Sequence, residues 1–275
     1  MKIILSPAKT FTRIKQVKSN FDADASAKLL FPKEQKQLRA ALEMLQINEL
    51  NQIWNISPEL AQKTYDQFFG NKQLPARPAI LSYDGLVYKQ LDVESLPDDA
   101  LDYLQKHLRI ISGYYGLLRP FDLIHFYRLE MKSALALSDQ SQTISLLDFW
   151  ADKLAKELVK ELKQEDQLDT HPAHASIVNL ASKEYAAAVL PQLPQSVSVV
   201  DIIFEKKVKD AKGQIKYKTL ATKSKMARGR MLRFLATEHI QHIEQIQEFQ
   251  ELELHFDEKR SNERAYHFVE EAGTL

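Results

Sequence analysis

The sequence predicts a mixed α/β fold, in which helices flank a mixed sheet and residues 1–275 form a single domain. Three observations support this fold class. Short apolar runs that end in turn residues are typical of buried strands. Stretches with apolar residues three and four positions apart are typical of helices packed on a core. The two kinds of segment alternate irregularly, which favours a mixed sheet over a regular doubly wound βαβ fold.

Strands are expected where short apolar runs meet turn residues. The first run, Lys2–Leu5, ends at Ser6-Pro7, and the run at 79–83 meets the turn pair Asp84-Gly85. A hairpin is expected at 206–220, with its turn at Lys212-Gly213. The expected strands are 2–5, 79–83 resumed at 86–88, 177–180, 197–204 and the two arms of that hairpin.

Helices are expected where apolar residues recur on one face. The clearest covers 57–70, where Ser57 is suited to the N-cap, Pro58 to the first turn and Gly70 to the position after the end. The other expected helices are 32–50, 98–108, 146–162 and 226–240.

Composition excludes several classes of protein. The chain has no cysteine, which excludes disulfides, thiolate metal sites and a cysteine nucleophile. No apolar run approaches the ~18 residues of a membrane span. The first apolar run meets Ser6-Pro7 too early for a signal peptide. We therefore expect a cytoplasmic monomer with no membrane partner.

Charge is balanced overall but segregated along the chain. Residues 206–233 hold eleven basic residues and one acid, whereas 238–275 hold ten acids and three basic residues. The first twenty residues add five bases and no acid. Two interpretations stay open. The basic segment forms a face that meets phosphates, or it pairs internally with the acidic segment that follows.

Glycine usage singles out one corner. The chain has only seven glycines, and two of them, Gly113 and Gly116, lie within four residues after an expected helix. Glycines let backbone N–H groups approach a phosphate closely. The corner is therefore a candidate helix-hairpin-helix-like element for a DNA backbone, although the usual hairpin has one residue between its glycines. The alternative is a plain turn that ends a helix.

Charged residues also occur among large apolar ones. Arg119, Arg128 and Glu130 lie in segments rich in Phe, Tyr, Leu and Met. Charge in such surroundings is costly unless it is paired or used. Internal pairing, Arg128 with Glu130 or Arg119 with Asp122, is one interpretation, and a cleft lined by arginines is the other.

Two further groups of residues follow expected strands. Asn179, Ser182 and Glu184 stand where a strand gives way to a helix, which is where α/β proteins often bind ligands. Each of them also suits a capping role at that helix. Lys9 follows the first strand, but Lys9-Thr10 lacks the glycines of a P-loop, so we expect a simple cation beside a cleft.

Metal and hydrolytic chemistry have little support. His171 with His174, and His239 with His242, share a three-residue spacing, but two imidazoles are too few for a closed site. We expect no metal and no cofactor. No Ser/His/Asp order or paired carboxylates stand out, so whether the protein is an enzyme stays open.

Seven ordered blocks of this chain resemble signatures of the YaaA family of peroxide stress proteins, a family defined by a domain of unknown function. They are Ile4-Leu5-Ser6-Pro7-Ala8-Lys9-Thr10, Tyr83-Asp84-Gly85-Leu86-Val87-Tyr88, Ser112-Gly113-Tyr114-Tyr115-Gly116-Leu117-Leu118-Arg119-Pro120, Tyr127-Arg128-Leu129-Glu130-Met131, Phe149-Trp150, Asn179-Leu180-Ala181-Ser182-Lys183-Glu184-Tyr185 and Ala227-Arg228-Gly229. The chain departs from the family pattern at three positions. Phe126 replaces a proline, and Lys132 and Ala151 replace glycines.

The resemblance implies a cytosolic protein of the peroxide response that keeps free intracellular iron low and limits damage to DNA. It also implies an α/β fold with a positively charged cleft, a helix-hairpin-helix-like element and DNA binding. We expect the DNA backbone to be held with little sequence preference. The expected contacts are Lys9, Gly113, Gly116, Arg119, Arg128, Lys223, Lys225, Arg228 and Arg233.

A second hypothesis is an enzyme that uses the same cleft on a small phosphorylated or nucleobase-containing substrate. Lys9, Arg128, Asn179 and Glu184 would then contact this small anionic ligand. The hairpin over 206–218 is expected to be mainly a solvated accessory, because only the part of the basic segment from Lys223 to Arg233 lies with family signatures.

Overall fold

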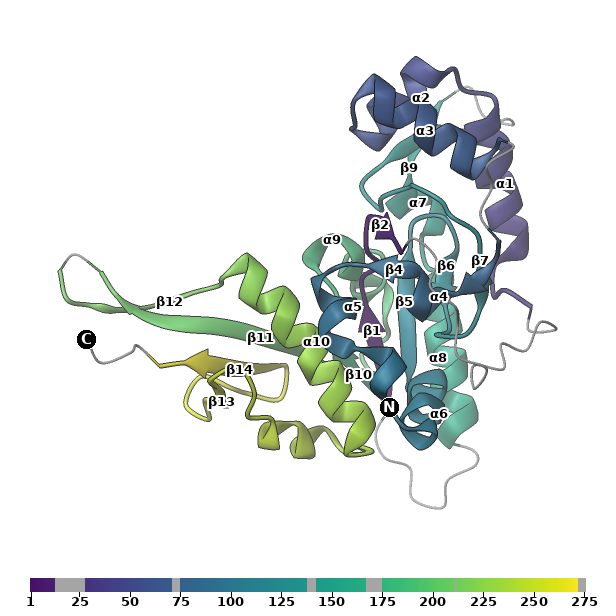
Figure 1. The fold of residues 1–275 in the computed structure, drawn as a ribbon. Coiled ribbons are helices and arrows are strands. Elements are labelled where there is room, and N and C mark those ends of the chain that lie inside the picture. The colour runs from purple at the N-terminus through teal and green to yellow at the C-terminus, as the bar shows by residue number, and fades with distance from the viewer. Residues whose placement is uncertain (13–27, 71–74, 138–141, 167–174, 211, 272–275) are drawn as a thin grey trace.

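The computed structural model describes residues 1–12, 28–70, 75–137, 142–166, 175–210 and 212–271 (Figure 1). Its main sheet has eight strands, paired in the order β13-β14-β11-β10-β1-β5-β6, with β12 beside β11. The five strands from β14 to β5 are parallel, and β13, β6 and β12 are antiparallel to their partners. Their bounds are β1 (Lys2–Leu5), β5 (Leu108–Ser112), β6 (Gly116–Leu118), β10 (Ser176–Asn179), β11 (Ser198–Lys209), β12 (Ile215–Lys218), β13 (Leu254–Phe256) and β14 (Ala265–Glu270).

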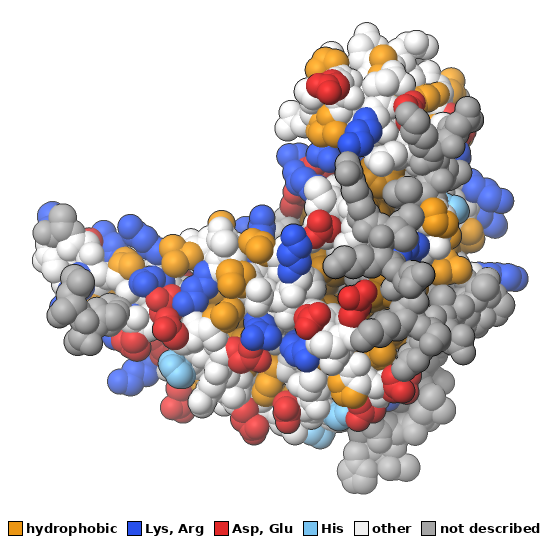
Figure 2. Space-filling view, in the orientation of Figure 1, with side chains coloured by type: hydrophobic (Ala, Val, Ile, Leu, Met, Phe, Trp, Pro, Cys, Tyr) orange, Lys and Arg blue, Asp and Glu red, His pale blue; other side chains and the backbone are white. Residues whose placement is uncertain are grey.

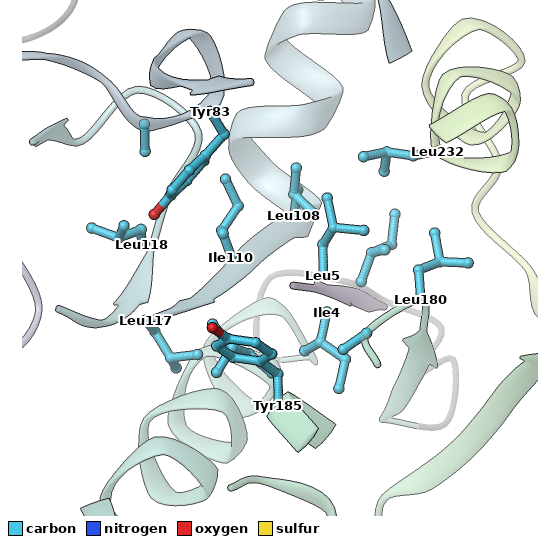
Figure 3. Close-up of a cluster of buried hydrophobic side chains, with 14 of the residues drawn as sticks. Ile4, Leu5, Tyr83, Leu108, Ile110, Leu117, Leu118, Leu180, Tyr185 and Leu232 are labelled. Carbon is cyan, nitrogen blue, oxygen red and sulfur yellow. The ribbon is translucent and has the colours of Figure 1, made fainter. Parts of the chain in front are cut away.

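The core lies around the central strands. All residues of β1, β5 and β10 are buried, as expected for parallel strands covered on both faces. Figure 3 shows Leu5 and Ile110 from adjacent strands packed with Leu180, directly after β10, and with Leu232 from α10 (Ala221–Thr237). This packing fixes the carboxyl ends of β1 and β10 against α10.

Helices and short strands cover the sheet. Three pairs of short strands stand apart from it, namely β2 (Thr10–Phe11) with β4 (Tyr83–Asp84), β3 (Arg77–Pro78) with β7 (Leu123–Ile124), and β8 (Ala134–Ala136) with β9 (Thr143–Ser145). The remaining α-helices are α1 (Pro32–Glu43), α2 (Ile47–Trp54), α3 (Pro58–Phe68), α4 (Ala79–Ser82), α5 (Leu86–Leu91), α6 (Asp98–His107), α7 (Leu146–Trp150), α8 (Lys153–Asp166) and α9 (Lys183–Ala186).

Two projections meet at an angle in Figure 1. Helices α1 to α3 form one, and β11 to β14 form the other, which we call the arm. Helix α9 and strand β2 lie at the inner corner between them, whereas α6 and α8 lie at the opposite end of the sheet. Among the described residues, no helix combines the length and the apolar character that crossing a membrane requires.

The predicted mixed α/β fold with a mixed sheet and flanking helices is confirmed. The single domain over residues 1–275 stays a prediction. Ser57 caps α3 as expected, because its side chain accepts from the Leu60 N–H. The hairpin over 206–220 is also present, with Gly213 at φ 73° in its turn.

Three expected elements are wrong. Residues 79–83 and 86–88 form helices α4 and α5 in place of a strand, and only Tyr83–Asp84 pairs, as β4. The helix expected at 32–50 is divided into α1 and α2. The helix expected at 146–162 is also divided, since Ala151 adopts φ 42° between α7 and α8.

The helix-hairpin-helix-like element is not at the predicted corner. Strands β5 and β6, and not helices, flank Gly113 and Gly116. A pair of helices joined by a short turn does occur elsewhere, in α2 and α3, where Asn55 adopts φ 50° at the end of α2.

Candidate functional site

The turns that follow β1 and β10 are bonded to each other. The two strands are parallel neighbours with Ile4 opposite Asn179, so their carboxyl ends lie side by side. The Ser6 hydroxyl accepts from the Ser182 N–H at 2.8 Å and donates to the Ser182 hydroxyl at 3.2 Å. This is the edge at which α/β sheets usually hold ligands.

Charged side chains from three segments gather at this edge. The Lys9 Nζ lies 2.8 Å from a Glu130 carboxylate oxygen, and the Lys132 Nζ lies 3.4 Å from the other oxygen. The Glu184 carboxylate accepts from the Lys132 N–H at 3.2 Å. We call Ser6, Lys9, Glu130, Lys132, Ser182 and Glu184 the carboxyl-edge cluster.

Glu130 is buried, whereas both lysines that approach it are more than half exposed. Burial alone would raise the pKa of the Glu130 carboxyl, but the hydrogen bonds and charges of Lys9 and Lys132 outweigh burial and hold this pKa below its usual range. Glu130 is therefore a carboxylate at neutral pH. It fixes two ammonium groups whose outer sides stay open to solvent.

Buried tyrosines hold the segment that carries Glu130. The Tyr127 hydroxyl lies 2.8 Å from the Tyr83 hydroxyl and accepts from the Ser112 hydroxyl at 2.8 Å. The Tyr88 hydroxyl donates to the Ser6 carbonyl oxygen at 2.9 Å. Burial raises the pKa of Tyr127 to about 12, so the phenol stays neutral and donates hydrogen bonds. These contacts position the cluster.

Two half-buried arginines belong to the same region. The Nε atoms of Arg128 and Arg228 are buried and have no hydrogen-bond partner among the described residues. Burial lowers the pKa of the Arg228 guanidinium, which nevertheless stays charged because a free arginine titrates far above neutral pH. Arg128 lies two residues before Glu130, on the segment that the tyrosines hold.

Arg228 is placed by the packing of α10 on α5. Its neighbour Gly229 lies so close to α5 that a Cβ there would be 2.2 Å from the Val87 carbonyl oxygen. Tyr88 of α5 in turn bonds to Ser6. Leu232, one turn after Arg228, packs beside Leu5 and Leu180 (Figure 3), and the N-terminal half of α10 points toward the inner corner in Figure 1. Arg228 therefore lies on the part of α10 that packs against α5, and α5 is joined to the carboxyl-edge cluster through Tyr88.

Several other predicted contacts are engaged inside the protein. Arg233 donates to the carbonyl oxygens of Leu91 and Asp92, at 2.9 and 3.1 Å, and to the Ser95 hydroxyl. It stabilises the end of α5. The Asn179 side chain donates to the Asp201 carboxylate at 2.7 Å and accepts from the Ala181 N–H. Asn179 thus shapes its own turn.

Of the two ion pairs considered from the sequence, Arg119 with Asp122 forms and Arg128 with Glu130 does not. The Arg119 guanidinium lies 3.6 Å from the buried Asp122 carboxylate, whose other oxygen accepts from the Arg119 N–H. This internal pairing is the one expected for Arg119. Glu130 pairs with lysines, and Arg128 is left without an ion-pair partner among the described residues.

The Gly113–Gly116 corner is buried. A Cβ on Gly113 would lie 2.7 Å from the Leu129 carbonyl oxygen, and Gly116 adopts φ 79° against Trp150. The N–H groups of Tyr114 and Tyr115 donate to the Ser112 hydroxyl. Because these donors are used internally, the corner is not placed to offer them to a phosphate, and its glycines allow close packing.

The basic segment is largely neutralised by acidic residues of the arm and of the segment around 251–253. Figure 2 shows basic and acidic side chains interspersed over it. Lys223, for example, contacts Glu270 and lies 3.8 Å from Glu253. The other pairs are Lys206–Glu270, Lys207–Glu271, Lys216–Asp210 and Arg230–Glu251. The internal pairing considered from the sequence therefore holds for much of this segment, and Lys225 stays exposed.

Sequence reasoning missed two members of the cluster. Lys132 lies just after a signature block, and only the folded loop brings it to Glu130. Ser6 was recognised as part of a turn, but its bond to Ser182 depends on strand pairing. Of the histidine pairs, His171 and His174 lie outside the described residues, and His239 contacts Asp99 at 3.2 Å. Within the described ranges no cluster of three or more metal-ligating side chains occurs.

Comparison with known proteins connects these residues to a family. The family model described as "Peroxide stress protein YaaA" matches residues 1–260. A protein of Lactiplantibacillus plantarum, named UPF0246 protein, is 39% identical over 98% of this chain and 99% of its own length. The chain belongs to the YaaA family. UPF0246 proteins of Finegoldia magna and Lachnoclostridium phytofermentans are 37% and 34% identical over 98% of this chain, and over 98% and 96% of their own lengths.

Membership of the YaaA family supports a general role in the response to oxidative stress. The three-dimensional structure gives a reason for several of the family signatures. Lys9, Glu130 and Glu184 come from three different signature blocks and meet in the carboxyl-edge cluster. Gly229 of the Ala-Arg-Gly block brings α10 close to α5. Three of the blocks that resemble YaaA signatures thus meet at one edge of the sheet.

Proposed function

We propose that this YaaA-family protein binds the sugar-phosphate backbone of DNA at the carboxyl edge of its sheet. The observation that carries the proposal is the pair of half-buried arginines, Arg128 and Arg228, whose Nε atoms have no partner among the described residues. A desolvated guanidinium without a partner is costly. A phosphate offers it a charge-assisted, bidentate contact.

The surrounding cations fit the same ligand. Lys9 and Lys132 are held by Glu130 but are 59% and 57% exposed, so each can also approach a phosphate. Lys225 is exposed on α10. Contacts of this kind are made with the DNA backbone and not with the bases, so we expect little sequence preference. One chain acting as a monomer is sufficient for this interface.

In the cell, this binding would serve the peroxide response. The family resemblance adds limitation of free intracellular iron and of DNA damage, in the cytosol. We include both in the proposal, with DNA binding as the molecular activity.

The test is the salt dependence of duplex binding. Each phosphate that is neutralised contributes about 0.9 to the slope of log affinity against log salt concentration. Arg228→Ala should weaken binding roughly tenfold and lower this slope by about 1. Arg228→Lys should restore only part of the affinity, because it keeps the charge but not the planar fork.

Lys160→Ala is the matched control, since Lys160 is exposed, pairs with Glu157 on α8 and stands one residue before Glu161, which contacts Lys2 at the opposite end of the sheet. It should bind as the unsubstituted protein does. Absence of duplex binding at low salt, or affinity that does not change with salt, would contradict the proposal.

The second candidate function is an enzyme acting on a small phosphorylated or nucleobase-containing substrate at this edge. It is favoured by the presence of Glu130 and Glu184 among the lysines, because backbone binding needs only cations. Glu184→Gln distinguishes the two. If this variant keeps ligand binding and protects cells from peroxide as the unsubstituted protein does, the catalytic alternative fails.

A further inference from the structure

The distal part of the arm is a two-stranded antiparallel ribbon. In it the end of β11 pairs with β12, with Lys206 opposite Lys218 and Lys209 opposite Ile215. Figure 1 shows this ribbon extending away from the body of the protein. It carries six lysines and one acid, Asp210, over residues 206–218. A strand pair of this kind is narrow enough to enter the major groove of DNA, which is ~12 Å wide.

Half of the ribbon lysines are already paired, and these lie mainly toward its base. Lys206 and Lys207 contact Glu270 and Glu271, and Lys216 contacts Asp210. The others, Lys209, Lys212 and Lys218, are exposed and have no ion-pair partner among the described residues. Two of these unpaired lysines, Lys209 and Lys212, thus lie at the part of the ribbon that projects furthest, and Lys218 lies opposite Lys206 nearer its base.

We propose that the ribbon is a second DNA contact, in which Lys209, Lys212 and Lys218 neutralise phosphates flanking a groove. The inference rests on the proposed function, and it assigns to the ribbon a role beyond the carboxyl edge. Charge complementarity selects the partner, because a projecting lysine-rich ribbon attracts a polyanion and repels a second copy of itself.

The structure also gives the spacing of the two contacts. Asp201 on β11 is opposite Asn179, at the end of β10, and Lys209 lies eight residues further along the same strand. At ~3.3 Å per residue Lys209, at the outer end of β11, is about 26 Å from the carboxyl edge. With ~3.4 Å per base pair, this distance corresponds to about 8 base pairs of duplex. Shorter duplexes cannot reach both contacts.

The experiment compares two DNA lengths, a duplex of about 18 base pairs and a stem of about 5 base pairs closed by a loop. The variant carries Lys209→Ala, Lys212→Ala and Lys218→Ala. On the longer duplex its salt slope should fall by about 2 to 3, since each lost phosphate contact removes about 0.9. On the short stem the variant and the unsubstituted protein should have the same affinity and the same slope.

The control variant removes the same charge elsewhere, through Lys106→Ala, Lys156→Ala and Lys160→Ala. These exposed lysines lie on α6 and α8, outside the arm and outside the carboxyl-edge cluster. This variant should leave both slopes unchanged. If it lowers the slope as much as the ribbon variant does, the effect is one of net charge and the ribbon proposal is overturned.

The remaining outcomes separate the two proposals. If the unsubstituted protein binds the longer duplex and the ribbon variant has an equal slope, the ribbon contact is refuted while DNA binding at the carboxyl edge stands. An alternative role for lysines on an edge strand is to prevent that strand from pairing with other chains. In that case the ribbon variant would form larger species in gel filtration with its DNA affinity unchanged, which also overturns the proposal. If the unsubstituted protein binds neither DNA, the proposed function itself fails.

Discussion

Substituting Gly229 tests the packing that places Arg228. A Cβ at this position would lie 2.2 Å from the Val87 carbonyl oxygen, whereas ordinary contact begins at 3.4 Å. The clash is with backbone, so no side-chain rotation relieves it, and α10 and α5 must separate by about 1 Å. Overpacking of this kind costs about 1–3 kcal/mol. Alanine gains ~1 kcal/mol of helix propensity over glycine. We therefore expect Gly229→Ala to lower the free energy of unfolding by about 2 kcal/mol at most.

The assay is urea unfolding followed by circular dichroism, with the midpoint compared at equal m-value. Thr222→Ala, at an exposed position of the same helix, is the control and should change stability by less than ~0.5 kcal/mol. Gly229→Ala should also weaken DNA binding, because it displaces Arg228. An unfolding midpoint above that of the unsubstituted protein, as helix propensity alone would give, would refute the close approach of the two helices.

Two further predictions concern stability. Ala151 adopts φ 42° and ψ −121°, so Ala151→Gly should raise the free energy of unfolding by about 1 kcal/mol. The control, Ala187→Gly, is at an exposed position with φ −60° and should not raise it. Equal effects of the two substitutions in urea unfolding would contradict the strain at Ala151. Lys9 and Lys132 lower the pKa of Glu130 in the folded protein below its unfolded value of about 4.5. The ionised Glu130 therefore stabilises the folded state above that unfolded value, and this contribution is lost as the pH falls through the lower folded pKa. The stability advantage over Glu130→Gln, about 1 kcal/mol or less at pH 7, should shrink as the pH falls below about 4.5, and an advantage that grows in acid would oppose this assignment.

Local patterns predicted the elements whose cause is local. Lys2–Leu5 is an apolar run that becomes a central strand, and Ser57 with Pro58 marks the start of α3 because both act within one turn. The runs at 79–83 and 86–88 were mistaken for a strand because short apolar runs suit either structure. Helix α5 is held by α10, whose Gly229 is about 140 positions away in the sequence. Such a contact leaves no trace in the periodicity of α5.

In the candidate site, too, local sequence patterns indicate some residues, whereas the roles of others depend on distant partners. Lys9, Arg128 and Arg228 were proposed as contacts because each stands in a distinctive block of sequence, and they stay predictions. The roles of Asn179 and Arg119 depended on partners that only strand pairing or a tight turn could reveal, namely Asp201 and Asp122. Residue type alone therefore indicates which groups can bind an anion. Whether a group is still free to bind depends on neighbours that are distant in sequence.

The balanced net charge of the chain constrains how it could bind DNA. With 37 basic and 37 acidic residues, the protein has no net attraction for a polyanion at long range, and at physiological salt charges are screened beyond ~8 Å. Binding must then depend on cations that touch phosphates. The acids are placed accordingly. They neutralise the base of the arm, through Glu270 and Glu271, and fix Lys9 and Lys132 through Glu130, while Arg128, Arg228 and the outer lysines of the ribbon have no acidic partner among the described residues. A neutral protein arranged in this way favours contact at two defined places over general adhesion to nucleic acid.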